Sequence, residues 1–351
     1  MTTNKNHNSP NVPNLRFPEF EGEWEKIELQ DIVPNICSGK DKISNSGKVV
    51  LYGSTGVIGK TDFASYKKNI VLVARVGANA GQLQIGNAPC GVTDNTLVID
   101  AKEWNYYIYY FLQHYNLNRL VFGSGQPLIT GGMLKKIKVG HGNKVERIKI
   151  TRLLCLLDKR IATQNKIIER YESLIRGIAQ KIARNNKPNV LLAECLKCSS
   201  STLQESDVCE NGTYPVYGAN GIVGYLDGYS TEDEAVHIIK DGSGVGTVSY
   251  VTGKCSATGT LNTLQAKDGY LLQYLYYMLK VFNFEPYKTG MAIPHIYFKD
   301  YGKAKIFCPS YTEQLKYVDL LSAIDNKLSV EQRILTNLSL QKQYLLRLMF
   351  I

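Results

Sequence analysis

The sequence predicts an α+β protein in which two copies of one mixed α/β domain are separated by two long helices. Two observations lead to this prediction: a long stretch of the chain is repeated, and each copy ends in a tail with heptad spacing. At 351 residues the chain is also longer than a single compact domain usually is. Because solenoid repeats have periods of ~20 to 50 residues, a repeat this long indicates a duplicated domain.

The repeat is clearest in a glycine loop, Tyr52-Gly-Ser-Thr-Gly-Val-Ile-Gly59, which returns 165 residues later as Tyr217-Gly-Ala-Asn-Gly-Ile-Val-Gly224. Further matches follow in the same order: Gly77 and Gly81 with Gly242 and Gly246, Asn95-Thr-Leu97 with Asn262-Thr-Leu264, and Glu146 to Asp158 with Glu313 to Asp325. Each half of the chain is therefore one globular domain followed by one tail.

The globular domains are expected at residues 17–144 and 185–311. Each contains short β-rich runs that are separated by glycine turns, for example Ile70–Ala74 and Ala235–Ile239. Each also has one aromatic-rich segment with the apolar spacing of a helix, Trp104–Tyr115 and Tyr270–Phe282. We expect these helices to pack on the strands and to place most of their tyrosines in the core.

The tails, residues 145–184 and 312–351, are predicted to be long helices. In both, seam residues recur at alternating steps of four and three, which is the a/d pattern of a coiled coil. The first seam is Ile150, Leu154, Leu157, Ile161, Gln164, Ile168, Tyr171, Ile175, Ile178 and Ile182, and the second is Tyr317, Leu321, Ile324, Leu328, Glu331, Leu335, Leu338, Lys342, Leu345 and Met349. A single helix cannot bury such a stripe, so the two are expected to pair, with polar Gln164 and Glu331 fixing the register. The alternative is two helices of a larger core.

The charge of the chain favours a polyanionic partner. The net charge is +10, and residues 144–184 hold eleven basic and four acidic side chains, whereas residues 312–351 hold five and four. A surface that faces phosphates would explain the excess on the first tail, and a solvated helix face would explain it equally well.

The N-terminal residues 1–16 are polar and rich in Asn, which predicts a disordered lead-in without the features of a signal peptide. No apolar run approaches the length that a membrane span needs. We therefore expect a soluble cytoplasmic protein that has no membrane partner.

Two further motifs suggest chemistry that the rest of the sequence does not support. Cys195 and Cys198 form a C-x-x-C pair, but no second pair with zinc spacing accompanies it, so the cysteines are expected to be free thiols and no metal is predicted. The string from Gly53 to Thr61 resembles a phosphate-binding loop but has the wrong glycine spacing. Neither a nucleophile elbow, nor a zinc-protease motif, nor an adenine methyltransferase motif is present, so we predict that the chain is not an enzyme.

The order of these features resembles the specificity subunit of Type I restriction-modification systems. The resemblance covers nearly the whole chain and rests on the two glycine loops, on the duplication, and on several strings. These strings are Leu15-Arg-Phe-Pro-Glu-Phe20 with Trp24, Ser124-Gly-Gln-Pro-Leu-Ile-Thr130, Thr289-Gly-Met-Ala-Ile-Pro-His-Ile296, and Gln314 to Asp325.

The resemblance implies two target recognition domains held apart by two long conserved helices that form an antiparallel coiled coil. Each domain would read one half of a bipartite site in double-stranded DNA. The resemblance also implies methyltransferase subunits, which carry S-adenosylmethionine and methylate adenine, and restriction subunits, which translocate with ATP and Mg. This chain itself would bind no cofactor.

The candidate DNA-reading residues lie in the matched loops. We expect base contacts from Ser54, Thr55, Arg75 and Gln126 in the first domain, and from Asn220, Lys240, Asp241 and His295 in the second. Phosphate contacts are expected from Lys135, Lys136, Lys299 and Lys303. Two alternative functions remain open at this point: the specificity subunit of a Type IIB-like restriction-modification enzyme, and a coiled-coil adaptor without DNA readout.

Overall fold

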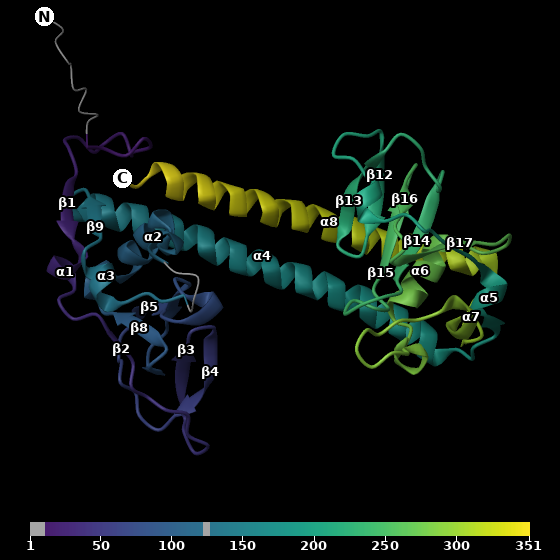
Figure 1. The fold of residues 1–351 in the computed structure, drawn as a ribbon, viewed down its shortest axis with the longest axis horizontal. Coiled ribbons are helices and arrows are strands. Elements are labelled where there is room, and N and C mark those ends of the chain that lie inside the picture. Colours follow the sequence, from purple (N-terminus) through teal and green to yellow (C-terminus); the bar gives the residue numbers. More distant parts are fainter. Residues whose placement is uncertain (1–10, 122–126) are drawn as a thin grey trace, which may run out of the picture. The chain divides into compact units, whose positions relative to one another are not determined.

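The computed structural model describes residues 11–121 and 127–351 (Figure 1). The chain divides into two compact units, residues 1–164 with 334–351 (unit 1) and residues 165–333 (unit 2). Each unit therefore consists of one globular domain and a part of each long helix. Among the residues that the structure describes, no helix is both long enough and apolar enough to cross a membrane.

The globular domain of unit 1 contains three antiparallel or mixed sheets, with strand orders β1-β9, β2-β8-β5-β6 and β4-β3-β7. Its strands are β1 (Glu25–Glu28), β2 (Cys37–Ser38), β3 (Val49–Gly53), β4 (Gly56–Thr61), β5 (Ile70–Ala74), β6 (Leu83–Gly86), β7 (Cys90–Val92), β8 (Thr96–Ile99) and β9 (Lys138–His141). Its helices are α1 (Leu29–Ile32), α2 (Asn105–Tyr115) and α3 (Gly131–Lys135), with 3-10 turns at Gly77–Asn79, Lys102–Trp104 and Leu117–Leu120.

Unit 2 repeats this architecture sheet by sheet, with strand orders β10-β18, β11-β17-β14-β15 and β13-β12-β16. Its strands are β10 (Val190–Leu191), β11 (Leu196–Ser200), β12 (Tyr214–Gly218), β13 (Gly221–Leu226), β14 (Glu234–Ile239), β15 (Val248–Thr252), β16 (Ser256–Ala257), β17 (Leu261–Ala266) and β18 (Lys305–Ile306). Its helices are α5 (Leu192–Cys195), α6 (Leu272–Lys280) and α7 (Phe298–Tyr301), with 3-10 turns at Glu205–Asp207 and Glu285–Tyr287. The predicted duplication and α+β class are confirmed.

Strand β5 is buried along its whole length because both of its faces meet apolar clusters. Val71 and Val73 point into the main core of unit 1, whereas Ile70 and Leu72 belong to a second, smaller cluster. This explains why the sequence shows a continuous apolar run instead of the alternation that a half-exposed strand has.

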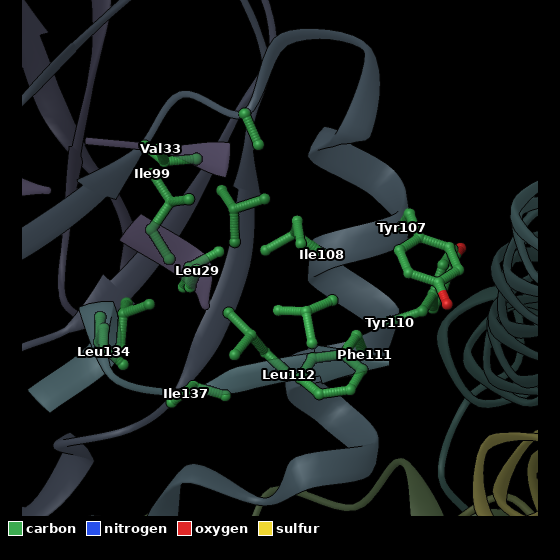
Figure 2. Packing of buried hydrophobic residues seen from close by; sticks show 14 of the residues in the cluster. Leu29, Val33, Ile99, Tyr107, Ile108, Tyr110, Phe111, Leu112, Leu134 and Ile137 are labelled. Atoms are coloured by element: carbon green, nitrogen blue, oxygen red, sulfur yellow. The ribbon is translucent and has the colours of Figure 1, made fainter. Parts of the chain in front are cut away.

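The main core of unit 1 forms between α2 and the four-stranded sheet β2-β8-β5-β6 (Figure 2). Ile108 points from α2 toward Leu29, whereas the rings of Tyr107 and Tyr110 project from the other side of the helix (Figure 2). Both rings are buried, and the Tyr107 hydroxyl donates a hydrogen bond of 2.7 Å to the carbonyl of Gly140. The predicted aromatic-rich helices and the core role of their tyrosines are thus confirmed.

The two tails are single helices, α4 (Lys144–Asn185) and α8 (Tyr311–Leu348). Their bounds agree with the predicted 145–184 and 312–351, except that residues 349–351 leave the helix and Met349 and Phe350 enter the core of unit 1. Every predicted seam position is buried or half-buried. This burial supports the heptad assignment.

Within each unit the two helices run antiparallel. In unit 1 the first part of α4 meets the last part of α8, where Lys342 Nζ lies 2.7 Å from Asp158 Oδ1. In unit 2 the last part of α4 and the first part of α8 line one cavity of about 460 Å³, with Ile175 on one side and Leu328 on the other.

The N-terminal segment differs from its expectation as a disordered lead-in. Residues 1–10 lie outside the described residues, but residues 11–16 are fixed to unit 1 by hydrogen bonds. The Leu15 amide donates to the carbonyl of Leu348 at 2.9 Å, and Arg16 Nε donates to Glu146 Oε1 at 2.7 Å. Composition alone did not predict this order, because the bonding partners lie more than a hundred residues away.

Candidate nucleic-acid interface

In unit 1 the loop that follows β5 is tied to residues 127–129 by two backbone hydrogen bonds. The Gly77 amide donates to the carbonyl of Pro127 at 3.0 Å, and the Ile129 amide donates to the carbonyl of Arg75 at 2.9 Å. Gly77 has a φ of +77°, a conformation that glycine adopts without strain. This requirement accounts for the glycine that recurs here in both copies.

Unit 2 builds the same junction after β14. The Gly242 amide, whose residue has a φ of +93°, donates to the carbonyl of Pro294 at 2.9 Å. The Ile296 amide donates to the carbonyl of Lys240 at 2.9 Å. Two loops far apart in sequence are thereby joined in the same way in both units, and we call each pair a paired loop (residues 75–77 with 127–129, and residues 240–242 with 294–296).

The paired loop of unit 2 brings three predicted readers together. Asp241 and His295 form an antiparallel β-bridge, and Lys240 precedes Asp241. The Asp241 side chain is exposed, while Lys240 and His295 are half-buried. The paired loop of unit 2 thus contributes an ammonium group, a carboxylate and an imidazole, which are side chains of the kinds that hydrogen-bond to base edges.

The paired loop of unit 1 is described in part. Arg75 is half-buried. Its neighbour Val76 forms a β-bridge with Leu128, and Leu128 is the residue of unit 1 that corresponds to His295 of unit 2. Gln126, the amide predicted to accompany Arg75, lies outside the described residues. Arg75 is therefore the one predicted reader that this part of the structure places in the paired loop of unit 1.

Ser54, Thr55 and Asn220 lie at the tips of two equivalent hairpins. Ser54 and Thr55 join β3 to β4, and Asn220 lies in the turn between β12 and β13. In unit 1, Gln84 Nε2 of β6 donates a hydrogen bond of 2.6 Å to the carbonyl of Gly53 and so attaches the hairpin to the neighbouring sheet. Thr55 and Asn220 are exposed and Ser54 is half-exposed, so all three can be reached from solvent.

The same hairpin explains why the string from Gly53 to Thr61 is not a phosphate-binding loop. Lys60 lies inside β4 and pairs with Val50 of β3, instead of standing at the start of a helix. A phosphate-binding loop requires a helix N-terminus at this point.

The four predicted phosphate-binding lysines lie on or beside the short helices that follow the paired loops. Lys135 and Lys136 end α3, whose first turn is capped by the Thr130 hydroxyl, and Lys299 lies on α7 with Lys303 close behind it. Among the described residues none of these lysines forms an ion pair, and neither does Arg75 or Lys240. These charges are therefore available to a polyanion.

Sequence reasoning did not predict the apolar side chains that stand in solvent beside these polar ones. In unit 2 they are Met291, Ile293 and Tyr297, and in unit 1 they include Val57, which follows the tip of the β3–β4 hairpin. Met291 and Ile293 belong to a string that carries the family resemblance, and apolar residues in a loop bounded by Gly290 and Pro294 were a signal that could have identified them.

The described residues contain no group of three or more metal-ligating side chains that could hold an ion. The eight cysteines are free thiols. Cys195 is buried and forms a side-chain hydrogen bond with the Cys308 thiol, and Cys198 lies on β11.

Both globular domains match one protein family. Residues 21–173 and 192–340 match the family described as Type I restriction modification DNA specificity domain. The chain is 28% identical over 116 residues to the Type I restriction enzyme EcoprrI specificity subunit of Escherichia coli, a match that covers 33% of this chain and 29% of that protein. The curated relatives are matched over only about a third of their own length.

Two solved structures resemble the fold over almost the whole chain. The Type-I restriction-modification system S subunit from M. genitalium has a TM-score of 0.69 at 19% identity, covering 97% of this chain and 99% of that one. A structure from work on complex assembly and conformational transition of the type I R-M system has a TM-score of 0.51 at 13% identity, covering 93% and 97%. At these identities the likeness is one of fold.

Proposed function

Because the chain belongs to the Type I restriction modification DNA specificity domain family, which it matches twice, we propose that it reads a bipartite DNA site and directs partner enzymes to it. Each unit reads one half of the site, and the sequence between the halves is not read. The chain is a specificity subunit and not the catalytic part of the system.

The observation that carries this proposal is the paired loop that occurs once in each unit. Both paired loops are held by equivalent backbone hydrogen bonds but display different side chains: Arg75 in unit 1, and Lys240, Asp241 and His295 in unit 2. A constant backbone with different polar side chains suits two readers of different sequences, because base identity is read by hydrogen bonds to base edges. The lysines on and beside α3 and α7, which form no ion pair among the described residues, supply the phosphate contacts that position each reader.

The partners follow from this role. We propose that the chain assembles in the cytoplasm with methyltransferase subunits, which bind S-adenosylmethionine and methylate adenine, and with restriction subunits, which use ATP and Mg. We assign the binding of these cofactors to the partner subunits and not to this chain. A Type IIB-like enzyme would need the same DNA reading without separate restriction subunits.

Methylome sequencing tests the proposal. A host that expresses the chain together with its methyltransferase subunit is expected to carry adenine methylation at one split sequence, and a host lacking the gene for this chain is expected to lose it. Unchanged methylation in the absence of the chain would contradict the proposal. A coiled-coil adaptor without DNA readout would give that unchanged result.

A further inference from the structure

The loop 289–295 of unit 2 carries two large apolar side chains into solvent. Met291 has a relative exposure of 106% and Ile293 one of 66%. Exposed side chains of this size normally occur singly, and here two stand in one short loop. Their position therefore requires an explanation beyond the packing of unit 2.

The backbone of this loop is held in one conformation. Thr289 and His295 exchange two backbone hydrogen bonds, of 2.9 and 2.8 Å, which close the loop at its base. Gly290 has a φ of +88°, and a Cβ at this position would lie 2.3 Å from the carbonyl oxygen of Ile293. Pro294 accepts the hydrogen bond from Gly242 that defines the paired loop. Met291 and Ile293 therefore lie in a turn that is closed by backbone hydrogen bonds. This turn continues directly into the paired loop of unit 2.

Charged and polar side chains adjoin the two apolar ones. Lys240, Asp241 and His295 lie in the paired loop at the base of the loop, and Lys299 follows it, with its Nζ 5.1 Å from the ring centroid of the exposed Tyr297. Apolar side chains on a loop that Lys240 precedes in the fold and Lys299 follows fit a DNA groove, where phosphates flank the edges of the bases. In the major groove the apolar feature of a base edge is the C5 methyl group of thymine.

We propose that Met291 and Ile293 are specificity-determining residues that contact thymine C5 methyl groups in the half-site read by unit 2, an inference that rests on the proposed function. Burial of one methyl group against apolar side chains corresponds to about a fourfold gain in affinity. The half-site of unit 2 therefore contains at least one A·T pair that is recognised by apolar contact.

Replacing thymine by deoxyuridine tests this inference, because the exchange removes only the methyl group. The chain, assembled with its methyltransferase subunit, is first used to select its split sequence from a random duplex library. The half-site that changes when residues 17–144 are exchanged belongs to unit 1, so the other belongs to unit 2. Duplexes with deoxyuridine at each thymine of the unit 2 half-site are then compared with the parent duplex.

The wild-type complex is expected to bind at least one such duplex about fourfold more weakly. The double variant Met291→Ala with Ile293→Ala is expected to bind the thymine and deoxyuridine duplexes equally. The conservative pair Met291→Leu with Ile293→Val retains the preference, and thymines in the unit 1 half-site respond alike in all three proteins.

Three results would overturn the inference while leaving the proposed function intact: a selected unit 2 half-site without thymine, a wild-type complex indifferent to deoxyuridine there, or a double variant that still prefers thymine. A wild-type complex that selects no split sequence would overturn the inference and the proposed function together. A double variant that loses only its binding to the methyltransferase subunit would identify the loop as a protein contact and would also overturn the inference.

Discussion

The hydroxyl of Tyr110 donates a hydrogen bond of 2.8 Å to Oδ2 of Asp158 and so joins α2 to α4. Tyr277, 167 positions later, donates the equivalent bond of 3.2 Å to Asp325 and joins α6 to α8. Burial raises the pKa of both tyrosines, so the hydroxyls remain protonated donors. Each globular domain is therefore fastened to the helix that follows it by the same bond.

Removing the Tyr110 hydroxyl is expected to weaken the attachment of α2 to α4 and so to lower the stability of unit 1. Tyr110→Phe keeps the ring but leaves Asp158 with Lys342 as its remaining partner, so the free energy of unfolding should fall by about 1 kcal/mol. Tyr277→Phe should cost a similar amount in unit 2. Urea unfolding of the two variants checks the prediction, and Tyr115→Phe, on the same helix α2 and with no hydroxyl hydrogen bond among the described residues, serves as a control. A fall in the control as large as in Tyr110→Phe would contradict it.

Arg16 and Glu146 form an ion pair that the second unit does not repeat. The Glu146 side chain is fully buried and accepts two hydrogen bonds from Arg16, of 2.7 and 2.9 Å, whereas its counterpart Glu313 is exposed. Breaking a buried pair leaves an uncompensated charge.

Arg16→Ala should therefore destabilise the protein by about 2 to 4 kcal/mol, the lower end reflecting that Arg16 is itself partly exposed to solvent. Glu313→Gln, the matched change in unit 2, should cost at most about 1 kcal/mol, since among the described residues the exposed Glu313 carboxylate accepts hydrogen bonds only from the amide and hydroxyl of Ser310 at the start of α8. Thermal unfolding measures both. Equal shifts in melting temperature would show that the buried pair has no special role.

His237 gives unit 2 a dependence of stability on pH. Its side chain is buried on β14, neither ring nitrogen has a hydrogen-bond partner, and burial lowers its pKa to about 4. In the unfolded chain His237 takes up a proton near pH 6.5, whereas in the folded protein it stays neutral until about pH 4. Protonation therefore favours the unfolded chain, and the contribution of neutral His237 to the free energy of unfolding is fully present above pH 6.5 and is lost as the pH falls toward 4.

The equivalent position in β5 is Leu72, which supplies a matched replacement. His237→Leu should remove this pH-dependent destabilisation, which amounts to up to about 3 kcal/mol between pH 6.5 and 4. His114, whose pKa is also lowered by burial, contributes to both proteins and cancels in the difference. Chemical unfolding at several pH values gives the comparison. Parallel pH profiles for wild type and variant would refute the assignment to His237.

The lysines after the paired loop of unit 1 should act through phosphate contacts. Lys135→Ala with Lys136→Ala is expected to reduce the slope of log affinity against log salt concentration by about 0.9 for each phosphate that is no longer neutralised, for all DNA sequences alike. Lys26→Ala on β1 is a control with an exposed lysine elsewhere in unit 1. Fluorescence anisotropy at several salt concentrations measures the slopes of the assembled complex. A change of preferred sequence with an unchanged slope would instead make these lysines base readers.

The repeat, the α+β class and the two long helices could be predicted because they depend on local spacing and on similarity within the chain. The pattern that places Ile150 and Leu154 on one helix face is visible in a short stretch of sequence. The bond between Leu15 and Leu348 could not be predicted in this way, since nothing local indicates the partner. For the candidate site, the matched glycines Gly77 and Gly242 lie in the paired loops, whereas DNA contact by these loops stays a prediction. Exposure of Met291 depends on the closed turn around it, which only the structure reveals.

The two reading domains should be exchangeable one at a time. Replacing residues 17–144 by the equivalent segment of a relative should change one half-site of the methylated sequence and leave the other unchanged, because the second paired loop lies entirely in unit 2. Unit 1 also contains residues 11–16 and the end of α8, and Phe350 packs 5.4 Å from Tyr107 between ring centroids. We therefore expect an exchange of 17–144 alone to be less stable than one that also carries the relative's counterparts of residues 11–16 and 345–351.

Both chimaeras should direct methylation to the same new sequence, since the added segments lie outside the paired loop, and the larger exchange should melt at the higher temperature. Methylome sequencing gives the sequences and thermal unfolding gives the stabilities. If a stable, assembled chimaera changed both half-sites at once, the two units would not read DNA independently. If the two chimaeras methylated different sequences, the ends of the chain would have to take part in reading as well as in packing.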